Sequence, residues 1–421
     1  MTEARLSETM RPGYFDWWHQ SDPEARRALV AASFGWMLDS FDVMLYALVL
    51  ASLILDLGIS KQAAGVLGSI TLLAAAVGGL IFGVIADRYG RVRALIGSVL
   101  TYAIFTAACG FAQNIVQLAI FRILLGFGMG GEWASGAALV SETWPDKHRG
   151  KALGIMQSSW AIGYALAALV AGLILPWRGW RAVFFVGILP ACLTLVVRRR
   201  VQEPDMWKRS KALHNEGSTL GFRSLFQGNL RPTTIAVTFM NACTLFAWWG
   251  FNLWVPAYLS LSRDQGGIGL SVHAMSGAVI AMQVGMWIGY VSFGFLSDLF
   301  GRKRCYVIYL ILAACLMFLY ARVHTLGLLL ALGPLVAFFG TGYYTGFATV
   351  TAEIYETRIR ATAQGFAYNT GRIASAAAPF AVGKLAQQHG FGIAFATAGA
   401  AFVIAALCWI WIPETKGRPF I

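Results

Sequence analysis

The stretch Gly83-Val-Ile-Ala-Asp87-Arg88-Tyr-Gly90-Arg91-Val-Arg93 decides the fold, because its pattern returns in the second half of the chain. The second copy is Gly294-Phe-Leu-Ser-Asp298-Leu-Phe-Gly301-Arg302-Lys303-Arg304. Each copy joins the end of one apolar run to the start of the next. We predict a tight turn in both, with the glycine before the arginine making the bend and the aspartate capping a neighbouring helix. The chain is therefore predicted to be a duplicated helical bundle.

The composition places this bundle in a lipid bilayer. Hydrophobic residues make up 57% of the chain and charged residues 13%, which is not the composition of a soluble globular protein. The net charge of +13 comes from basic residues in short loops, which indicates membrane orientation and not a nucleic-acid surface. The six cysteines have no paired spacing, so neither a disulfide framework, a metal site nor a cofactor is expected.

Apolar segments long enough to cross a bilayer predict twelve transmembrane helices, because one crossing takes about 20 residues. The predicted spans are 28–50, 62–86, 94–113, 115–141, 152–175, 181–197, 233–260, 272–297, 305–321, 325–350, 363–386 and 391–412. The polar stretch 198–232 divides them into two pseudo-symmetric six-helix bundles, 28–197 and 233–412. The segments 1–27, 198–232 and 413–421 are predicted to be a cytoplasmic N-terminal segment, linker and tail.

The orientation follows from the distribution of basic residues. The termini and the loops on their side hold 25 of the 33 Lys and Arg residues, and the opposite loops hold six. Because cytoplasmic loops are enriched in Lys and Arg, both termini and both copies of the motif are expected to face the cytoplasm. We therefore expect a multi-pass plasma-membrane protein, such as one of the bacterial inner membrane.

Several motifs resemble those of the major facilitator superfamily, and the resemblance covers essentially the whole chain. Besides the doubled motif, the matching stretches are Arg122-Ile-Leu-Leu-Gly126-Phe-Gly128-Met-Gly130-Gly131-Glu132, Glu142-Thr-Trp-Pro145, Glu203-Pro204, Glu353-Ile-Tyr-Glu356-Thr-Arg358 and Pro413-Glu414-Thr415-Lys416-Gly417. Within the superfamily, Asp39-Ser40-Phe41-Asp42 and Gly130-Gly131-Glu132-Trp133 look most like the sialate and monocarboxylate–proton symporters, with the aromatic acid–proton symporters next. The resemblance implies alternating access, no enzymatic activity and a monomer.

Five ionisable residues within the predicted spans carry most of the functional information, because a charge at mid-bilayer is costly and is kept where it has a partner or a task. They are Asp39, Asp42, Arg122, Glu132 and Arg372. The resemblance implies an ion pair between Asp42 and Arg122. We expect these acids and Arg122 to couple transport to protons, with Asp42 as the proton acceptor, while Asp39 could be structural and Arg122 could reach the outer interface.

Arg372 is expected near the centre of the eleventh span, where a guanidinium cannot reach the interface cheaply. Its planar fork suits a carboxylate. The sequence leaves two partners open, an anionic substrate or an acid from the other half. Further polar groups expected to line a substrate site are Asn369, Gln157, Tyr164, Asn241, Asn252, Gln283 and Tyr343, although each of them could serve packing instead.

The prediction is a proton-coupled symporter of a small organic acid anion such as a monocarboxylate or sialate. An aromatic acid–proton symporter is the first alternative, and a sugar carrier or a drug–proton antiporter comes after it. Arg372 separates these classes, because a sugar needs no central cation and a lipophilic cation is repelled by one. The expected partners are the anion, protons and the lipid bilayer.

Overall fold

The computed structural model describes residues 16–19, 21–189, 191, 225–228 and 230–416. The N-terminal half contains α1 (Asp16–His19), α2 (Pro23–Asp56), α3 (Lys61–Tyr89), α4 (Arg91–Cys109), α5 (Ile115–Thr143) and α6 (Asp146–Val186). The C-terminal half contains α10 (Leu230–Ser260), the short helix η1 (Arg263–Gln265), α11 (Val272–Phe300), α12 (Arg302–Tyr320), α13 (Leu326–Thr341), α14 (Tyr344–Ile354), α15 (Thr357–Ser375) and α16 (Ala378–Cys408).

Nine helices in the described part are long and apolar enough to cross a membrane, with the shorter Ile115–Gly131 beside them. Two long helical stretches turn back at glycines with positive φ, Gly179 (71°) in α6 and Gly390 (82°) in α16. The second of these turns divides Ala363–Cys408 into two crossings. The described part of the chain therefore has the predicted all-helical fold, and its helices account for the predicted spans apart from the part of the sixth that is not described. The sixth predicted span, 181–197, is described only at 181–189 and 191, and most of the linker 198–232 lies outside the described residues.

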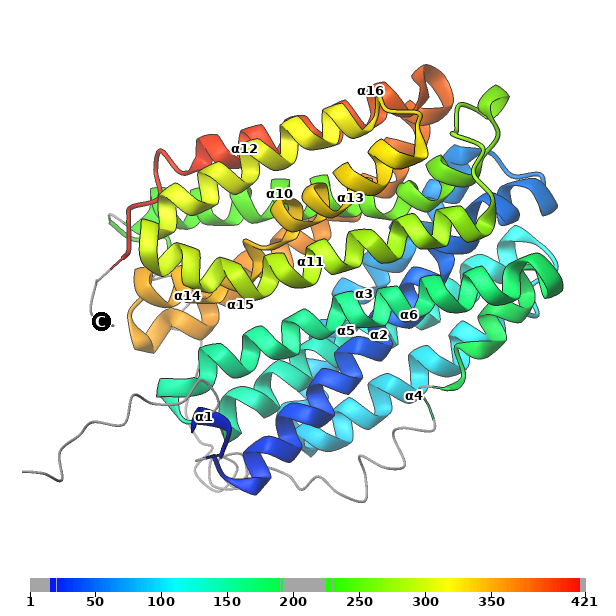
Figure 1. Cartoon of the computed structure of the whole chain (residues 1–421). Coiled ribbons are helices and arrows are strands. Elements are labelled where there is room, and N and C mark those ends of the chain that lie inside the picture. The colour runs from blue at the N-terminus through cyan, green and yellow to red at the C-terminus, as the bar shows by residue number, and fades with distance from the viewer. Residues whose placement is uncertain (1–15, 20, 190, 192–224, 229, 417–421) are drawn as a thin grey trace, which may run out of the picture.

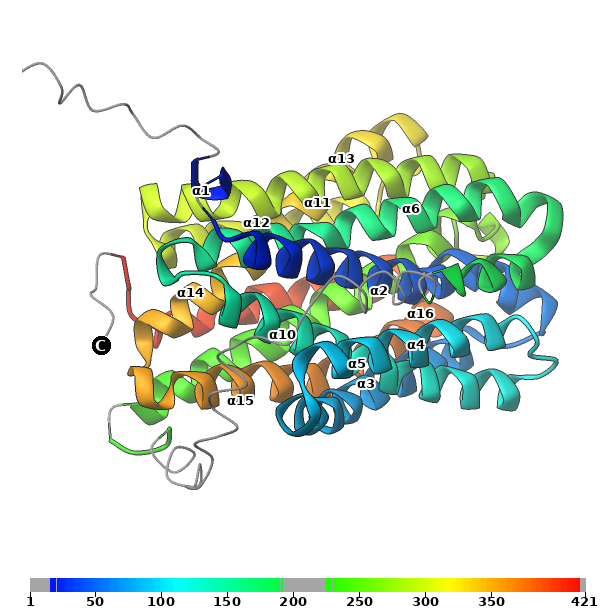
Figure 2. The same ribbon diagram turned by 90° about the horizontal axis from the view of Figure 1, so that it is seen from below.

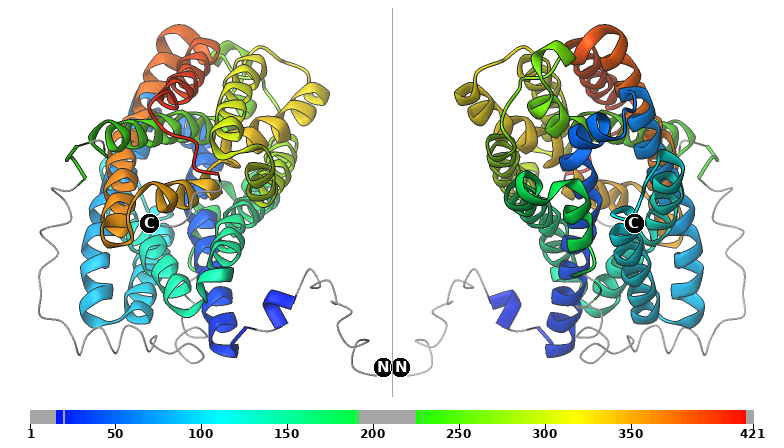
Figure 3. Two further views of the ribbon diagram at one scale, coloured as in Figure 1. Left: turned by 90° about the vertical axis from the view of Figure 1, so that its left-hand side faces the viewer. Right: turned by 90° about the vertical axis from the view of Figure 1, so that its right-hand side faces the viewer.

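The helices form two bundles, with α2–α6 below and α10–α16 above in Figure 1. Seen along the helices, the bundles meet across one broad interface (Figure 3). The main contacts between them join α6 to α11, α3 to α16 and α2 to α10, and α6 runs beside α11 in Figure 2. We use the name terminal end for the end that carries α1 and the last described residues, and distal end for the opposite one.

The repeated motif has the same backbone in both halves. Gly90 (φ 121°, ψ 150°) separates α3 from α4, and Gly301 (φ 100°, ψ 148°) separates α11 from α12. This positive-φ region is open to glycine and costly for other residues, so the predicted glycine bend is confirmed. The side chains of Asp87 and Arg91 lie outside the described residues, whereas Arg88 is exposed and Gly83 and Gly294 have open space around them.

Asp298 does not cap a neighbouring helix as predicted. It pairs with Arg302, four residues further along the chain. Arg302 also bonds the Glu353 carboxylate of α14 at 3.2 Å and the Ser297 hydroxyl at 2.8 Å. The bend at Gly301 places Asp298 beside Arg302. The Asp298 carboxylate is therefore engaged in this ion pair and does not cap another helix. The second copy of the motif therefore joins α11, α12 and α14.

The chain segment after α16 closes this network at the terminal end. The Glu414 carboxylate accepts hydrogen bonds from the backbone N–H groups of Arg302 (2.9 Å) and Lys303 (3.2 Å), the first residues of α12. The neighbouring Thr415 is buried and donates its hydroxyl to Glu353 at 2.5 Å. A carboxylate at a helix N-terminus satisfies orphan N–H donors and favours the helix dipole.

The glycine run of α5 allows three helices to approach closely. A Cβ on Gly126 or Gly130 would lie 2.4 Å or 1.9 Å from a backbone carbonyl oxygen of α3, and one on Gly128 would lie 2.5 Å from the backbone nitrogen of Tyr102 in α4. No side chain fits in such spaces. The run is therefore a packing feature, as small residues often are between membrane helices.

We predict that Glu414→Gln lowers the melting temperature of the purified protein at pH 7 by a few degrees. Burial raises the pKa of Glu414, but four backbone N–H donors outweigh that effect and hold the pKa below its usual value of 4.5. A lowered pKa means that the ionised group adds stability above that pH, and that this stability is lost as the pH falls through the folded-state value.

Thermal unfolding of both proteins from pH 7 down to pH 3 measures this effect. The difference in melting temperature should shrink below pH 4.5. Glu356→Gln is the matched control, because Glu356 is exposed at the start of α15 and makes no side-chain capping bond. An equal loss in both variants would show that Glu414 has no special role.

Candidate functional site

Two carboxyl groups lie fully buried in the middle of α2. Asp39 and Asp42 are both 0% exposed, and none of their four carboxyl oxygens has a well-directed hydrogen bond. Their spacing of three residues makes them neighbours on the surface of α2, but their side chains meet different surroundings. Asp39 faces the C-terminal half, where Arg372 attracts it electrostatically. Asp42 faces α4, beside Thr106.

The predicted ion pair between Asp42 and Arg122 is not formed in this conformation. Arg122 is 1% exposed, so the alternative that it reaches the outer interface is also wrong. Its Nε donates to the Thr71 hydroxyl at 3.0 Å and its guanidinium lies 4.1 Å from the centre of the Tyr46 ring, while Nη1 has no partner. A cation over an aromatic face is a favourable substitute for an anion. The glycine run lets α5 approach α3, which brings Arg122 to Thr71.

Arg372 lies at the interface between the two bundles, one turn before a break in the eleventh span. α15 ends at Ser375 and α16 begins at Ala378. The guanidinium is 6% exposed, and its Nη1 is close to Gly79 of α3 in the other half. Among the described residues it makes neither a hydrogen bond nor a salt bridge, although Asp39 is near enough to attract it. Arg372 is thus a buried cation whose hydrogen-bond donors are free.

The other predicted site residues divide into three groups: amides that bond helix backbone, residues that lie beside tyrosines of the C-terminal half, and residues in an apolar layer. Asn241 donates to the Ala367 carbonyl at 3.1 Å, and Asn369 donates to the Gly365 carbonyl at 2.9 Å, so both amides bond helix backbone. Gln157 is half-buried on α6 and interacts with the Tyr290 hydroxyl of α11. Tyr343 lies at the break between α13 and α14, where its ring faces that of Tyr344. The Glu132 side chain lies outside the described residues.

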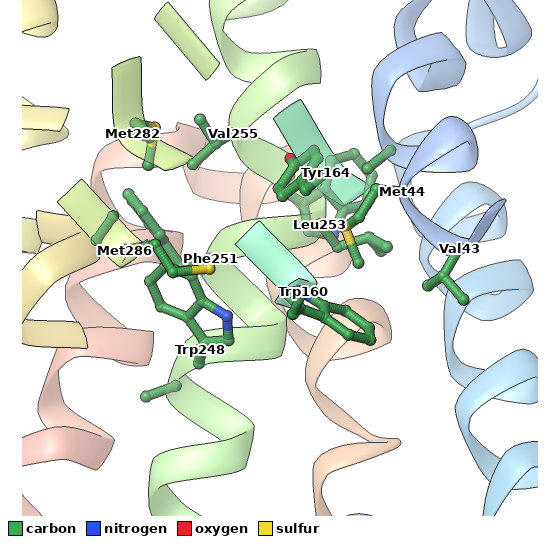
Figure 4. Packing of buried hydrophobic residues seen from close by; sticks show 14 of the residues in the cluster. Val43, Met44, Trp160, Tyr164, Trp248, Phe251, Leu253, Val255, Met282 and Met286 are labelled. Carbon is green, nitrogen blue, oxygen red and sulfur yellow. The ribbon is translucent and has the colours of Figure 1, made fainter. Parts of the chain in front are cut away.

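The third group lies toward the distal end, in an apolar layer between the halves. Figure 4 shows Tyr164 of α6 beside Met44 of α2 and Leu253 of α10, with Met282 of α11 across from them. Asn252 donates to the Met44 sulfur at 3.5 Å, and the buried Gln283 carbonyl oxygen has no partner. Tyr164, Asn252 and Gln283 are therefore buried in this apolar layer in the present conformation.

The distal end is closed by contacts between α3 and the C-terminal half. The Lys61 ammonium donates to the Gln265 carbonyl and lies over the Phe391 ring. The Gln62 N–H donates to the Gln387 side chain, and Gly65 touches the Pro379 backbone.

An aromatic row lies between the bundles, and sequence reasoning missed its member Trp36. Trp36 of α2 lies 4.6 Å from Trp160 of α6, and Trp160 lies 6.0 Å from Trp249 of α10, measured between ring centres. Trp36 is buried and its indole N–H has no partner. It precedes Asp39 by three residues and so shares its side of α2. The three-residue spacing between Trp36 and Asp39 is the sequence signal that could have identified Trp36.

These groups form a polar layer at the middle of the interface. It contains the Arg372 guanidinium, two carboxyl groups without a hydrogen-bond partner, tyrosine hydroxyls and tryptophan rings. They can hold an anion, stack a planar ring and exchange a proton, but they include no activated nucleophile. Within the described ranges, no three His, Cys, Asp or Glu side chains gather into a group that could hold a metal ion. Two six-helix bundles around such a layer define a membrane transport protein.

The comparisons with known proteins agree with this class. The family model described as "Major Facilitator Superfamily" matches residues 32–292 and 265–420, and the chain belongs to this family. A probable 4-methylmuconolactone transporter of Cupriavidus pinatubonensis is 33% identical over 411 residues, covering 96% of this chain and 94% of that protein. A cis,cis-muconate transport protein of Acinetobacter baylyi is 31% identical, with 93% and 95% covered.

More distant proteins support the fold. The sialic acid transporter NanX of Escherichia coli is 29% identical over 389 residues, covering 92% of this chain and 93% of that protein. The crystal structure of a D-xylose–proton symporter matches with a TM-score of 0.75 at 21% identity, covering 94% of this chain and 99% of that one. The protein is a transporter and not an enzyme.

Proposed function

We propose that this protein carries a small organic acid anion together with a proton, by alternating access. The observation that supports the proposal is Arg372, a buried guanidinium between the two halves with no bonded counter-ion. A buried guanidinium that no carboxylate bonds directly is costly, so an incoming carboxylate completes the site. A guanidinium holds both oxygens of a carboxylate in one plane.

The aromatic row favours a flat, unsaturated acid over a sialate or a small monocarboxylate. Rings spaced by 4.6 Å and 6.0 Å present aromatic faces and edges between the bundles, and such surfaces bind planar π-systems well. The names of two relatives, a cis,cis-muconate and a gentisate transporter, point to the same chemistry. The aromatic acid–proton symporter, which ranks second from the sequence, is therefore our preferred reading.

Asp39 is the acid that the geometry favours for proton coupling. In the empty site it is the carboxylate that Arg372 attracts. When the substrate carboxylate binds Arg372, Asp39 loses its counter-charge inside a buried interface and takes up a proton. The site has no net charge before and after this exchange, so the bundles can rock without moving an uncompensated ion. Asp42, beside Thr106, has a different environment and is the natural comparison.

The orientation of the bundle belongs to this proposal. Basic residues gather on the terminal side, so the terminal end faces the cytoplasm and the closed distal end faces outward. In a bacterial inner membrane, an inward proton gradient would then drive uptake of the acid.

We predict that Arg372→Ala weakens binding of an aromatic acid such as 4-hydroxybenzoate by roughly 100-fold, which is about 3 kcal/mol. Arg372→Lys should lose roughly 10-fold, because an ammonium keeps the charge but cannot hold both carboxylate oxygens. Isothermal titration with purified protein measures both, and size-exclusion profiles report folding. Wild-type affinity in Arg372→Ala would remove Arg372 from the site.

We predict that Asp39→Asn abolishes acid-driven accumulation in proteoliposomes but keeps counterflow exchange, because the variant binds the anion without titrating. Asp42→Asn is the matched control, one turn along the same helix and equally buried, and it should keep more of the accumulation. The reverse pattern would give the coupling role to Asp42, and full accumulation by both variants would remove it from α2.

A further inference from the structure

Three tyrosines and a glutamine meet between the halves on one side of Arg372. They are Tyr290 of α11, Tyr344 of α14, Tyr368 of α15 and Gln157 of α6, which we name the tyrosine group. Gln157 interacts with the Tyr290 hydroxyl, and Tyr344 lies within electrostatic reach of both Tyr290 and Tyr368. Tyr368 lies near Arg372 and Asp39 as well. The group thus continues from the anion-binding guanidinium into the interface.

The Tyr344 hydroxyl is buried and lies beside that of Tyr343, but it has no well-directed hydrogen-bond partner. A buried hydroxyl without a partner costs roughly 1–3 kcal/mol, so its place in the interface needs a reason. The helix break supplies the position: α13 ends at Thr341, α14 begins at Tyr344, and the two adjacent tyrosine rings lie 4.7 Å apart. Thr345, the next residue, bonds the Tyr290 carbonyl at 3.1 Å and keeps α14 against α11.

Every member of the tyrosine group is uncharged. Tyrosine hydroxyls and a carboxamide can both donate and accept hydrogen bonds, so they suit a neutral polar group. A second carboxylate would be buried there without a cation, which is costly. Gln157 belongs to the N-terminal half and the tyrosines to the other, so a ligand group held among them touches both bundles at once.

The geometry points to a second binding point of the transport site, in which Gln157, Tyr290 and Tyr344 hold a neutral hydroxyl or carbonyl group of the acid whose carboxylate Arg372 binds. The substrate class is then a planar acid with a hydroxyl or carbonyl group away from its carboxylate. This inference depends on the proposed function. It goes beyond the proposed function because it predicts that hydroxylated acids bind more tightly than unsubstituted acids and dicarboxylates.

Equilibrium binding of four probes to the purified full-length protein tests the inference: benzoate, 3-hydroxybenzoate, 4-hydroxybenzoate and terephthalate. At least one hydroxybenzoate should bind about 10-fold more tightly than benzoate, as one added hydrogen bond allows, and terephthalate should be the weakest. Tyr344→Phe removes only the hydroxyl. It should bring the hydroxybenzoate to the affinity of benzoate and leave benzoate binding unchanged, and Tyr290→Phe should act in the same direction.

Tyr320→Phe is the matched control, because the Tyr320 hydroxyl is also buried without a partner but lies on α12. It should keep the full preference for the hydroxylated probe. Equal affinity for benzoate and both hydroxybenzoates in the wild type, or a parallel loss for all probes in Tyr344→Phe, would overturn the second binding point while leaving Arg372 as the carboxylate site. Failure of every probe to bind would overturn the proposed function as well.

Discussion

A guanidinium held away from water between two helical bundles is the constraint on which the rest of the structure depends. Arg372 cannot lose its proton, and in a low-dielectric interface it is stable only near negative charge. Among the described residues, Asp39 is the carboxyl group that Arg372 attracts electrostatically. The two lie in different halves, so the electrostatic balance of the site is also an interaction between the bundles. Whatever binds Arg372 changes how the halves attract each other.

The surroundings of Arg372 connect this balance to the shape of the bundle. One turn after Arg372 the helix breaks, and the next segment, beginning at Ala378, packs against the first turns of α3 at the closed distal end. An apolar layer around Met44 and Tyr164 also packs between the two halves (Figure 4). A change at the guanidinium is therefore only one helix break away from the contacts that close the transporter on one side.

The sequence predicted the fold because that information is local. Hydrophobic length sets the crossings, and the repeated motif marks a turn whose backbone, at Gly90 and Gly301, proved the same in both halves. Partners of buried charges are set by helix rotation and depth, which spacing does not give. Asp39 and Asp42 look equivalent in the sequence, yet one faces the other bundle and one faces α4. The Arg122 guanidinium likewise lies over the Tyr46 ring and not beside an acid.

A substrate carboxylate that replaces Asp39 beside Arg372 should make Asp39 take up a proton. The most direct test is therefore the number of protons taken up when the purified protein binds an aromatic acid. Weakly buffered titration with a pH indicator, at saturating 4-hydroxybenzoate, measures it. The account predicts about one proton per bound anion in the wild type and none in Asp39→Asn, because the displaced carboxylate must be neutralised inside the interface. Anion binding without proton uptake in the wild type, or undiminished uptake in Asp39→Asn, would contradict it.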